Sequence, residues 1–254
     1  MEIELPKGLR SLAKEKIYLY GIDSIKTIDI LDQPTLLSIG AEAYILRGKF
    51  MGIDSIIKWR FPKPYIPPDL DREFRRFRTE IESKVMWKAL SVGVKAPIPL
   101  YIDVDDTIIV MTYIEGNTLR DIVDVIDSEK LCKICQEIGI YTAKMHSIGI
   151  SHGDLTTSNI IVSLKEGYAY LIDFGLASFC KRDEDYAIDI HIFFRAIESA
   201  HIAHEKTMKS CFINGYELIS GNSKTVKMLK IVNDIRKRGR YVAERKLRSE
   251  WRSV

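Results

Sequence analysis

The sequence predicts an α+β protein with a small antiparallel sheet in its N-terminal part and a reduced, mainly helical C-terminal part. Apolar segments of strand length follow one another between residues 35 and 59, separated by turn residues. Apolar positions then recur at helical spacing over residues 71–90 and again over 131–147. A further pair of short apolar strands lies within residues 152–175, with polar residues at their ends. Strands followed by helices in this order indicate two lobes.

The composition is that of a globular protein. The chain has 254 residues, of which 46% are hydrophobic and 29% are charged, and its net charge is +3. These values exclude a disordered or fibrous protein. No apolar run approaches the roughly 20 residues that span a bilayer, and charged residues interrupt the N-terminus where a signal segment would be apolar. We therefore expect a cytoplasmic protein that does not contact a membrane.

The four cysteines predict neither a redox pair nor a metal site. Cys132 and Cys135 form a C-x-x-C spacing, but they lie within a helical pattern and are interpreted as part of a helix face. Cys180 and Cys211 stand apart in the sequence. We expect all four to be reduced.

The chain divides into four expected segments: an N-terminal extension at 1–34, an N-lobe at 35–114, a C-lobe at 115–235 and a basic tail at 236–254. Four apolar residues predict a short amphipathic helix in the extension: Leu9, Leu12, Ala13 and Ile17. The extension either packs on the N-lobe or contacts a partner. The basic tail is either a solvated helix end or a contact surface for a partner.

Three side chains at the ends of the strands in 152–175 predict a metal and catalytic site. Asp154 and Asn159 precede the first strand, and Asp173 follows the second. Carboxylate and amide oxygens are the ligands that Mg²⁺ prefers, usually shared with substrate phosphates. The order Asp, Asn, two strands and Asp-Phe-Gly matches the catalytic and metal-binding loops of protein kinases. The alternative is a β-hairpin with acidic turns.

The strands between residues 35 and 59 predict a nucleotide-binding lobe of the same class. A loop between the first two strands would cover the phosphates of ATP: Gly40, Ala41, Glu42 and Ala43. Lys58 closes the third strand, where burial of a lysine requires a partner. It is the candidate contact for the α- and β-phosphates, the alternative being an edge-strand lysine that serves solubility.

The helix at 71–90 would supply the partner of Lys58. Glu82 is preferred over Glu80, because it lies one position after Ile81 and beside the apolar stripe of this helix. The apolar stripe expected to face the core consists of Phe74, Phe77, Ile81, Val85 and Met86. After the buried strand 108–111, the segment 112–116 is interpreted as the hinge that contacts adenine. Its predicted nucleotide-binding residues are Met111, Tyr113 and Ile114.

These residues together predict phosphoryl transfer. Asp154 would orient a hydroxyl or a water and accept its proton, Asp173 would hold Mg²⁺, and Asn159 would complete the metal site. Three departures from ordinary protein kinases are visible: the phosphate loop has a single glycine, the catalytic loop reads His-Gly-Asp, and Thr156 stands where a lysine usually touches the γ-phosphate. They predict an enzyme that is weak alone and completed by a partner, or one that mainly hydrolyses ATP.

The chain also resembles a known family, the small atypical kinase and ATPase subunit of the KEOPS (EKC) complex, which is related to the RIO kinases. The matching stretches are IGAEA at 39–43, IKWRFPK at 57–63, RTEIE at 78–82, ISHGDLTTSN at 150–159, IDFGL at 172–176 and RKRGR at 236–240. Neither an Ala-Pro-Glu motif nor a long segment follows Gly175, and the basic end fits the family too.

The resemblance implies a role that the residues alone do not give. Family members work in the complex that makes threonylcarbamoyladenosine in tRNA, with serine/threonine kinase and ATPase activity. Their partners are a sugar-kinase-fold ATPase subunit and small regulatory subunits, and tRNA is reached through the complex and the basic tail. Three alternatives differ in class: a RIO-type kinase of ribosome maturation, a small-molecule phosphotransferase, and a pseudokinase scaffold that binds nucleotide without catalysis.

Overall fold

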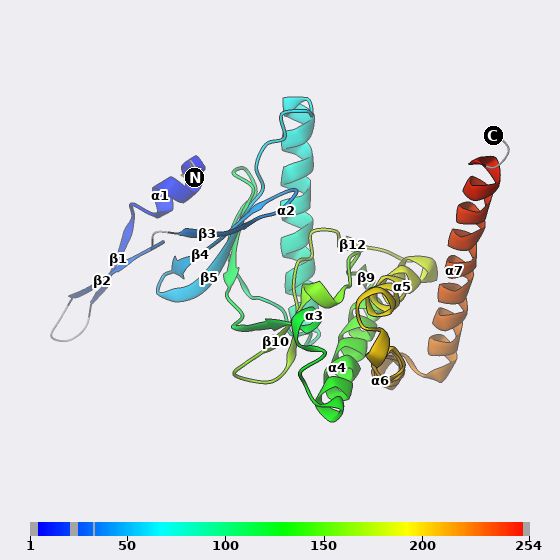
Figure 1. Ribbon diagram of the computed structural model, residues 1–254. Coiled ribbons are helices and arrows are strands. Elements are labelled where there is room, and N and C mark those ends of the chain that lie inside the picture. The colour runs from blue at the N-terminus through cyan, green and yellow to red at the C-terminus, as the bar shows by residue number, and fades with distance from the viewer. Residues whose placement is uncertain (1–4, 21–24, 33, 251–254) are drawn as a thin grey trace. The chain divides into compact units, whose positions relative to one another are not determined.

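The computed structural model describes residues 5–20, 25–32 and 34–250 (Figure 1), so parts of the predicted extension and the last four residues of the tail lie outside it. The chain forms two compact units. Unit 1 comprises Met1–Lys88 and Pro97–Ile114, and unit 2 comprises Ala89–Ala96 and Glu115–Val254. Unit 1 contains the large antiparallel sheet and unit 2 most of the helices. The predicted fold class is confirmed.

Unit 1 is built on a five-stranded antiparallel sheet in the order β3-β4-β5-β7-β6. Its strands are β3 (Thr35–Ile39), β4 (Tyr44–Phe50), β5 (Ile53–Trp59), β6 (Pro99–Asp103) and β7 (Ile108–Thr112). The three-stranded meander is present as predicted, with β4 longer than expected. The strand β6 is an addition, since a proline opens it and weakens its strand pattern.

The extension contributes to the core of unit 1. It forms α1 (Lys7–Leu12) and the hairpin of β1 (Lys16–Tyr20) and β2 (Ile25–Asp29). The predicted helix ends at Leu12, and Ile17 lies in β1 instead. Leu9 and Leu31 are fully buried and pack with sheet residues: Leu46, Phe50, Ile57, Ile108 and Val110. The helix α1 and the segment around Leu31 are therefore packed on the sheet, whereas β1 and β2 form a separate two-stranded sheet.

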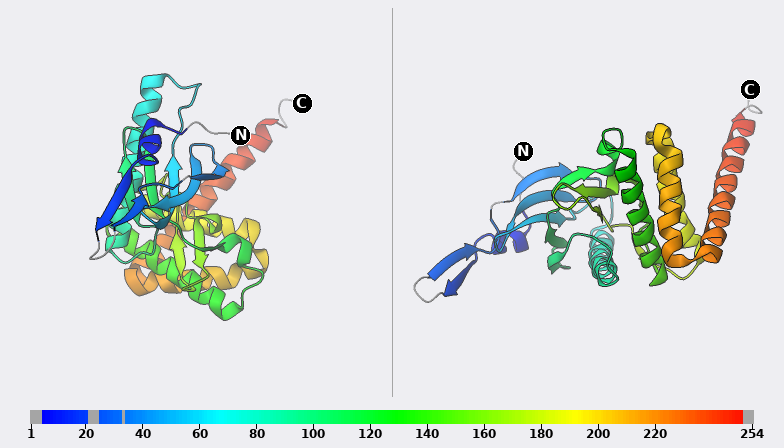
Figure 2. Two further views of the ribbon diagram at one scale, coloured as in Figure 1. Left: turned by 90° about the vertical axis from the view of Figure 1, so that its left-hand side faces the viewer. Right: turned by 90° about the horizontal axis from the view of Figure 1, so that it is seen from below.

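The helix α2 (Pro68–Ser91) lies beside the sheet, as the views of unit 1 in Figure 2 show. Val85 and Met86 are buried as predicted, and Ile81 is half-buried. The prediction for Phe74 and Phe77 is wrong, because their side chains are 52% and 59% exposed. The N-terminal half of α2, which contains these two residues, instead buries polar side chains. They form ion pairs that a hydrophobic pattern does not reveal.

Unit 2 contains a bundle of helices and two small sheets. Its helices are α3 (Leu119–Ile122), α4 (Ser128–Ser147), α5 (Asp183–Ala200), α6 (Glu205–Ser220) and α7 (Asn222–Glu250). One sheet has the order β11-β10-β8 and the other pairs β12 with β9. These strands are β8 (Gly116–Thr118), β9 (Ile150–Ser151), β10 (Ile160–Ser163), β11 (Ala169–Leu171) and β12 (Ser178–Phe179). Within the described residues, no helix is both long enough and apolar enough to cross a membrane.

Close packing of α4 on α6 brings two cysteines together. A Cβ on Gly139 would lie 2.1 Å from the carbonyl oxygen of Phe212, and one on Gly215 would lie 1.9 Å from that of Gln136. On the same two helices, Cys132 of α4 and Cys211 of α6 form a disulfide. The expectation that all four cysteines are reduced is therefore wrong for these two, because sequence spacing does not show which helix faces meet.

The remaining cysteines agree with the sequence interpretation. Cys135 is a buried thiol on α4, and burial raises its pKa to about 12. Cys180 is half-buried and also free. The C-x-x-C spacing therefore forms no pair of its own.

Cys211→Ser should lower the free energy of unfolding by about 2–4 kcal/mol, because the disulfide restricts a long loop of the unfolded chain. Denaturant unfolding under oxidising conditions measures this loss, with Cys180→Ser as the matched control. A reductant should bring the wild type to the level of Cys211→Ser. Equal stability of the two serine variants without reductant would contradict the expectation.

Candidate active site

The hairpin of β10 and β11 positions the three predicted catalytic and metal-binding side chains of unit 2. The strands are antiparallel, with Ile160 opposite Leu171. Asn159 precedes β10 and Asp173 follows β11, and the backbone N–H of Ile172 donates to the carbonyl of Asn159 at 3.0 Å. This bond closes the hairpin at the end where both polar side chains stand.

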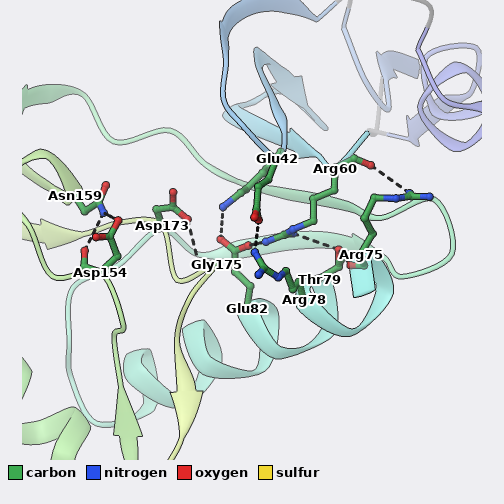
Figure 3. Close-up of polar contacts among 11 residues, drawn as sticks. Glu42, Arg60, Arg75, Arg78, Thr79, Glu82, Asp154, Asn159, Asp173 and Gly175 are labelled. Atoms are coloured by element: carbon green, nitrogen blue, oxygen red, sulfur yellow. Dashed lines mark hydrogen bonds and ion pairs between the residues drawn. The ribbon is translucent and has the colours of Figure 1, made fainter. Parts of the chain in front are cut away.

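Asp154 and Asn159 are brought together directly. The side-chain amide of Asn159 donates to Oδ2 of Asp154 at 2.8 Å and to its carbonyl oxygen at 2.9 Å (Figure 3). Because Nδ2 is used in this way, Oδ1 of Asn159 is the atom that can ligate a cation. Asp173 has a left-handed φ of 59°, and its Oδ1 accepts from the N–H of Gly175 at 3.1 Å.

These donors fit the cation that the sequence predicts. Two carboxylates and one amide oxygen form an all-oxygen set, which suits Mg²⁺ and leaves coordination positions for phosphate oxygens. Residues Asp154, Asn159 and Asp173 would be the protein ligands or would act next to them.

A carboxylate that sequence analysis missed holds the catalytic loop. Asp189 on α5 is 1% exposed, and it accepts from the backbone N–H groups of His152 at 2.6 Å and Gly153 at 2.8 Å. Nε2 of His146 lies 3.2 Å from the same carboxylate. The signal was a lone aspartate inside the apolar stretch 187–194, since such a residue is buried only when paired.

Gly153 is required by the same loop. Its φ is 80°, and a Cβ at this position would lie 2.1 Å from the carbonyl oxygen of Leu176. A side chain would force apart the catalytic loop and the segment after Asp173. The glycine in His-Gly-Asp therefore has a steric cause in this fold.

His152 is buried beside this loop. Its ring lies 4.9 Å from that of Phe174, centroid to centroid, and its Nδ1 accepts from the N–H of Asp154 at 3.4 Å. Burial lowers the pKa of His152 against the opposing effect of nearby carboxylates, chiefly that of Asp189. The imidazole is thus held neutral and packs as part of the core.

In unit 1, the lysine and the glutamate selected from the sequence are in contact. Nζ of Lys58 lies 2.8 Å from Oε1 of Glu82, and the two residues are 8% and 1% exposed. The alternative, Glu80, pairs with Lys84 on the surface instead. Arg60 forms a second ion pair with Glu82, to Oε2; the sequence analysis did not anticipate it.

The predicted phosphate loop lies between β3 and β4. The N–H of Gly40 donates to the carbonyl of Ala43 at 2.9 Å, which forms a tight turn. Glu42 pairs with Arg78 of α2, and Nζ of Lys63 lies 3.8 Å from its Oε1. The negative charge of Glu42, which would repel phosphates, is thereby balanced within unit 1.

The predicted hinge residues follow β7. Met111 is 8% exposed. The N–H of Tyr113 donates to the carbonyl of Asp54 at 2.9 Å, and the guanidinium of Arg47 lies 4.0 Å from the Tyr113 ring centroid. Since the amide of Tyr113 is engaged in unit 1, the backbone of Ile114 is the better candidate for an adenine contact.

Comparison with known proteins gives consistent results. A family model described as the protein kinase domain matches residues 72–227. The chain is 38% identical over 212 residues to the KEOPS complex subunit Bud32 of Pyrococcus abyssi, covering 81% of this chain and 96% of the relative. It is 34% identical over 213 residues to the EKC/KEOPS complex subunit Tp53rkb of Mus musculus, covering 81% and 86%.

One further relative is longer than this chain, and one solved structure resembles it in fold. A probable bifunctional tRNA threonylcarbamoyladenosine biosynthesis protein of Methanothermobacter thermautotrophicus is 36% identical over 208 residues, and the match spans 82% of this chain but 37% of the relative. The solved Rio2 kinase–ADP/Mg²⁺–phosphoaspartate complex of Chaetomium thermophilum has a TM-score of 0.55 and 13% identity, covering 92% of this chain and 85% of the other. The latter shows a shared fold.

The buried histidines predict a pH dependence of stability. Burial lowers the pKa of His152, and likewise of His191 and His201. The unfolded chain takes up these protons near about pH 6.5, while the folded chain resists them to lower pH. Stability is therefore complete above that value and falls as the pH drops below it, by up to about 1.4 kcal/mol per pH unit for the fully buried His152 and by less for the other two.

Denaturant unfolding between about pH 7.5 and about pH 5 measures this dependence. His152→Gln should reduce the slope, since it removes one of the three titrating groups. A free energy of unfolding that stays constant over this range, or a slope that His152→Gln leaves unchanged, would contradict the assignment.

Proposed function

The chain belongs to the Bud32 family of protein kinase-like KEOPS complex subunits, and on this premise we propose that it transfers phosphoryl groups from Mg-ATP within that complex. It acts as a serine/threonine kinase and as an ATPase in the formation of threonylcarbamoyladenosine in tRNA. Its partners are the sugar-kinase-fold ATPase subunit and small regulatory subunits. The protein acts in the cytoplasm.

The observation that carries the proposal is that both sets of phosphate-handling residues are intact. Unit 1 has the buried pair of Lys58 and Glu82, and unit 2 has the linked Asp154 and Asn159 in one hairpin with Asp173. A pseudokinase scaffold does not need the second set, because nucleotide binding without transfer requires no base and no ordered metal ligands. The likeness to the Rio2 kinase supports the fold, whereas the sequence relatives favour KEOPS over ribosome maturation.

Each residue has a role in this proposal. Lys58 contacts the α- and β-phosphates of ATP, and Glu82 holds it in place. Asp173 and Asn159 ligate magnesium, which would balance the charge of the phosphates. Asp154, oriented by the side-chain amide of Asn159, positions a hydroxyl or a water and accepts its proton.

The nucleotide base is held by unit 1. The backbone of Ile114 contacts adenine, and Met111 and Tyr113 border it. The turn formed by Gly40, Ala41, Glu42 and Ala43 covers the phosphates. Glu42 forms ion pairs with Arg78 and Lys63. These two cations reduce the electrostatic repulsion between Glu42 and ATP.

Slow transfer by the isolated chain follows from what the loops lack. Thr156 takes the place of a lysine, so one positive charge on the γ-phosphate is missing. A glycine takes the place of the arginine that reads a phosphorylated activation segment. Completion by a partner subunit is the simplest way to supply the missing stabilisation of the transition state.

The basic tail has a structural use at its start. Arg236 lies 2.7 Å from Oε1 of Glu198, and Arg238 lies 2.7 Å from Oε1 of Glu184. Both acids belong to α5, so these two arginines fasten α7 to α5. The remaining basic residues, from Arg240 to Arg252, are the ones that we propose for tRNA.

ATP turnover should rise when the sugar-kinase-fold subunit and tRNA are added together. Asp173→Ala should lower it by about a hundredfold or more in the mixture, because the stabilisation that the metal supplies is lost. Release of phosphate is the measurement, with Arg182→Ala, whose ion pair to Asp185 is on the surface, as control. Undiminished turnover by Asp173→Ala would overturn the catalytic assignment, and binding of ATP without turnover in the mixture would favour the pseudokinase alternative.

Removal of residues 239–254 should weaken tRNA binding and flatten its dependence on salt, since each lost phosphate contact lowers the slope of log K against log salt by about 0.9. The truncation keeps the ion pairs that Arg236 and Arg238 of α7 form with α5, and it therefore preserves that part of α7. Filter binding over a series of salt concentrations measures both quantities. Unchanged affinity at low salt would leave the tail without a tRNA role.

A further inference from the structure

Glu82 is shared by two cations, not one. Its Oε1 lies 2.8 Å from Nζ of Lys58. Its Oε2 is paired with the guanidinium of Arg60 (Figure 3). All three residues are buried, at 1% exposure for Glu82, 1% for Arg60 and 8% for Lys58. Two buried cations thus share the two oxygens of one buried carboxylate.

Stability of the fold does not explain the second cation. The pair of Lys58 and Glu82 is neutral by itself, and adding a buried charge incurs a desolvation cost that is recovered only with very good geometry. Among the described residues, Nε of Arg60 has no hydrogen-bond partner, and an unsatisfied buried donor is destabilising. An arginine retained under these conditions points to a role in the chemistry of the site.

The position of Arg60 is fixed from several sides. Its Nη1 donates to Oγ1 of Thr79 on α2 at 3.3 Å. Its backbone N–H donates to the carbonyl of Thr107 at 3.1 Å, and its carbonyl accepts from Oγ1 of Thr107 at 2.8 Å. Arg75 also donates to that carbonyl, at 3.4 Å. Because both its backbone and its guanidinium group are hydrogen-bonded, the side chain of Arg60 is held in one position.

The rigidity of Arg60 has a consequence for Lys58. The flexible ammonium of Lys58 has to serve both Glu82 and the phosphates of ATP. If Lys58 were the sole partner of Glu82, drawing it toward phosphate would weaken the hold on a buried carboxylate. With Oε2 bound to Arg60, Glu82 stays in place and its Oε1 continues to orient Lys58.

We propose that Arg60 is a positioning residue for the nucleotide-binding lysine and acts through Glu82. At 1% exposure it does not touch the nucleotide itself. The inference rests on the proposed function in one respect, namely that Lys58 contacts the phosphates of ATP.

The test is the affinity for Mg-ATP of the full chain, titrated by calorimetry. Arg60→Met keeps the length of the side chain and removes the charge and the fork. It should weaken Mg-ATP binding by about tenfold or more, as expected for loss of one charge-assisted hydrogen bond that orders the binding group. Arg60→Lys keeps the charge without the fork and should fall between Arg60→Met and the wild type. The matched control is Arg76→Met, which removes a surface ion pair to Asp105 and should leave the affinity unchanged.

A double-mutant cycle separates positioning from general support of the fold. In a Glu82→Gln background, Arg60→Met should change the affinity by less than about twofold, because the group through which it acts is already lost. If Arg60→Met proves too unstable, the same cycle with Arg60→Lys gives the answer. Equal losses in both backgrounds, or wild-type affinity of Arg60→Met, would overturn the inference. Failure of the wild type to bind Mg-ATP would instead overturn the proposed function.

Discussion

Each unit is organised around one carboxylate that is almost fully removed from water and therefore has to be paired. In unit 1 this is Glu82, whose two oxygens are bound by Lys58 and Arg60. In unit 2 it is Asp189, which binds the backbone of the catalytic loop and the ring of His146. Breaking either arrangement leaves a buried charge without compensation, so the functional side chains are held by a strong energetic constraint.

The two arrangements differ in what they hold. Glu82 orients a charged side chain directly, whereas Asp189 fixes a stretch of backbone and lets the loop carry Asp154 and Asn159. Gly153 belongs to the second arrangement, because its left-handed backbone lets its N–H reach Asp189 while avoiding Leu176. The group proposed for phosphate binding thus depends on one buried acid, and the groups proposed for metal binding and proton transfer depend on another.

The sequence was sufficient where local pattern and chemistry coincide. A lysine at the end of an apolar strand and a glutamate beside an apolar stripe identified the pair of Lys58 and Glu82, and the hairpin after Asn159 was visible from its two strands. It was insufficient where distant elements meet. Arg60 follows a strand and looks like a surface residue, Asp189 interrupts an apolar helix without a visible partner, and Cys132 finds Cys211 only through the approach of α4 to α6. Phe74 and Phe77 were misplaced for the same reason, since ion pairs and not apolar contacts occupy that face of α2.

The central proposal is that Lys58 of unit 1 and Asp173 of unit 2 are each needed to bind Mg-ATP. Calorimetric titration of Mg-ATP into the wild type, Lys58→Met, Asp173→Asn and the double variant tests it most directly. The account predicts that each single change weakens binding, because each removes a group proposed to hold the phosphates or their magnesium, and that the double variant binds no more tightly than the weaker single variant. Mg-ATP affinity equal to that of the wild type in either single variant would contradict it.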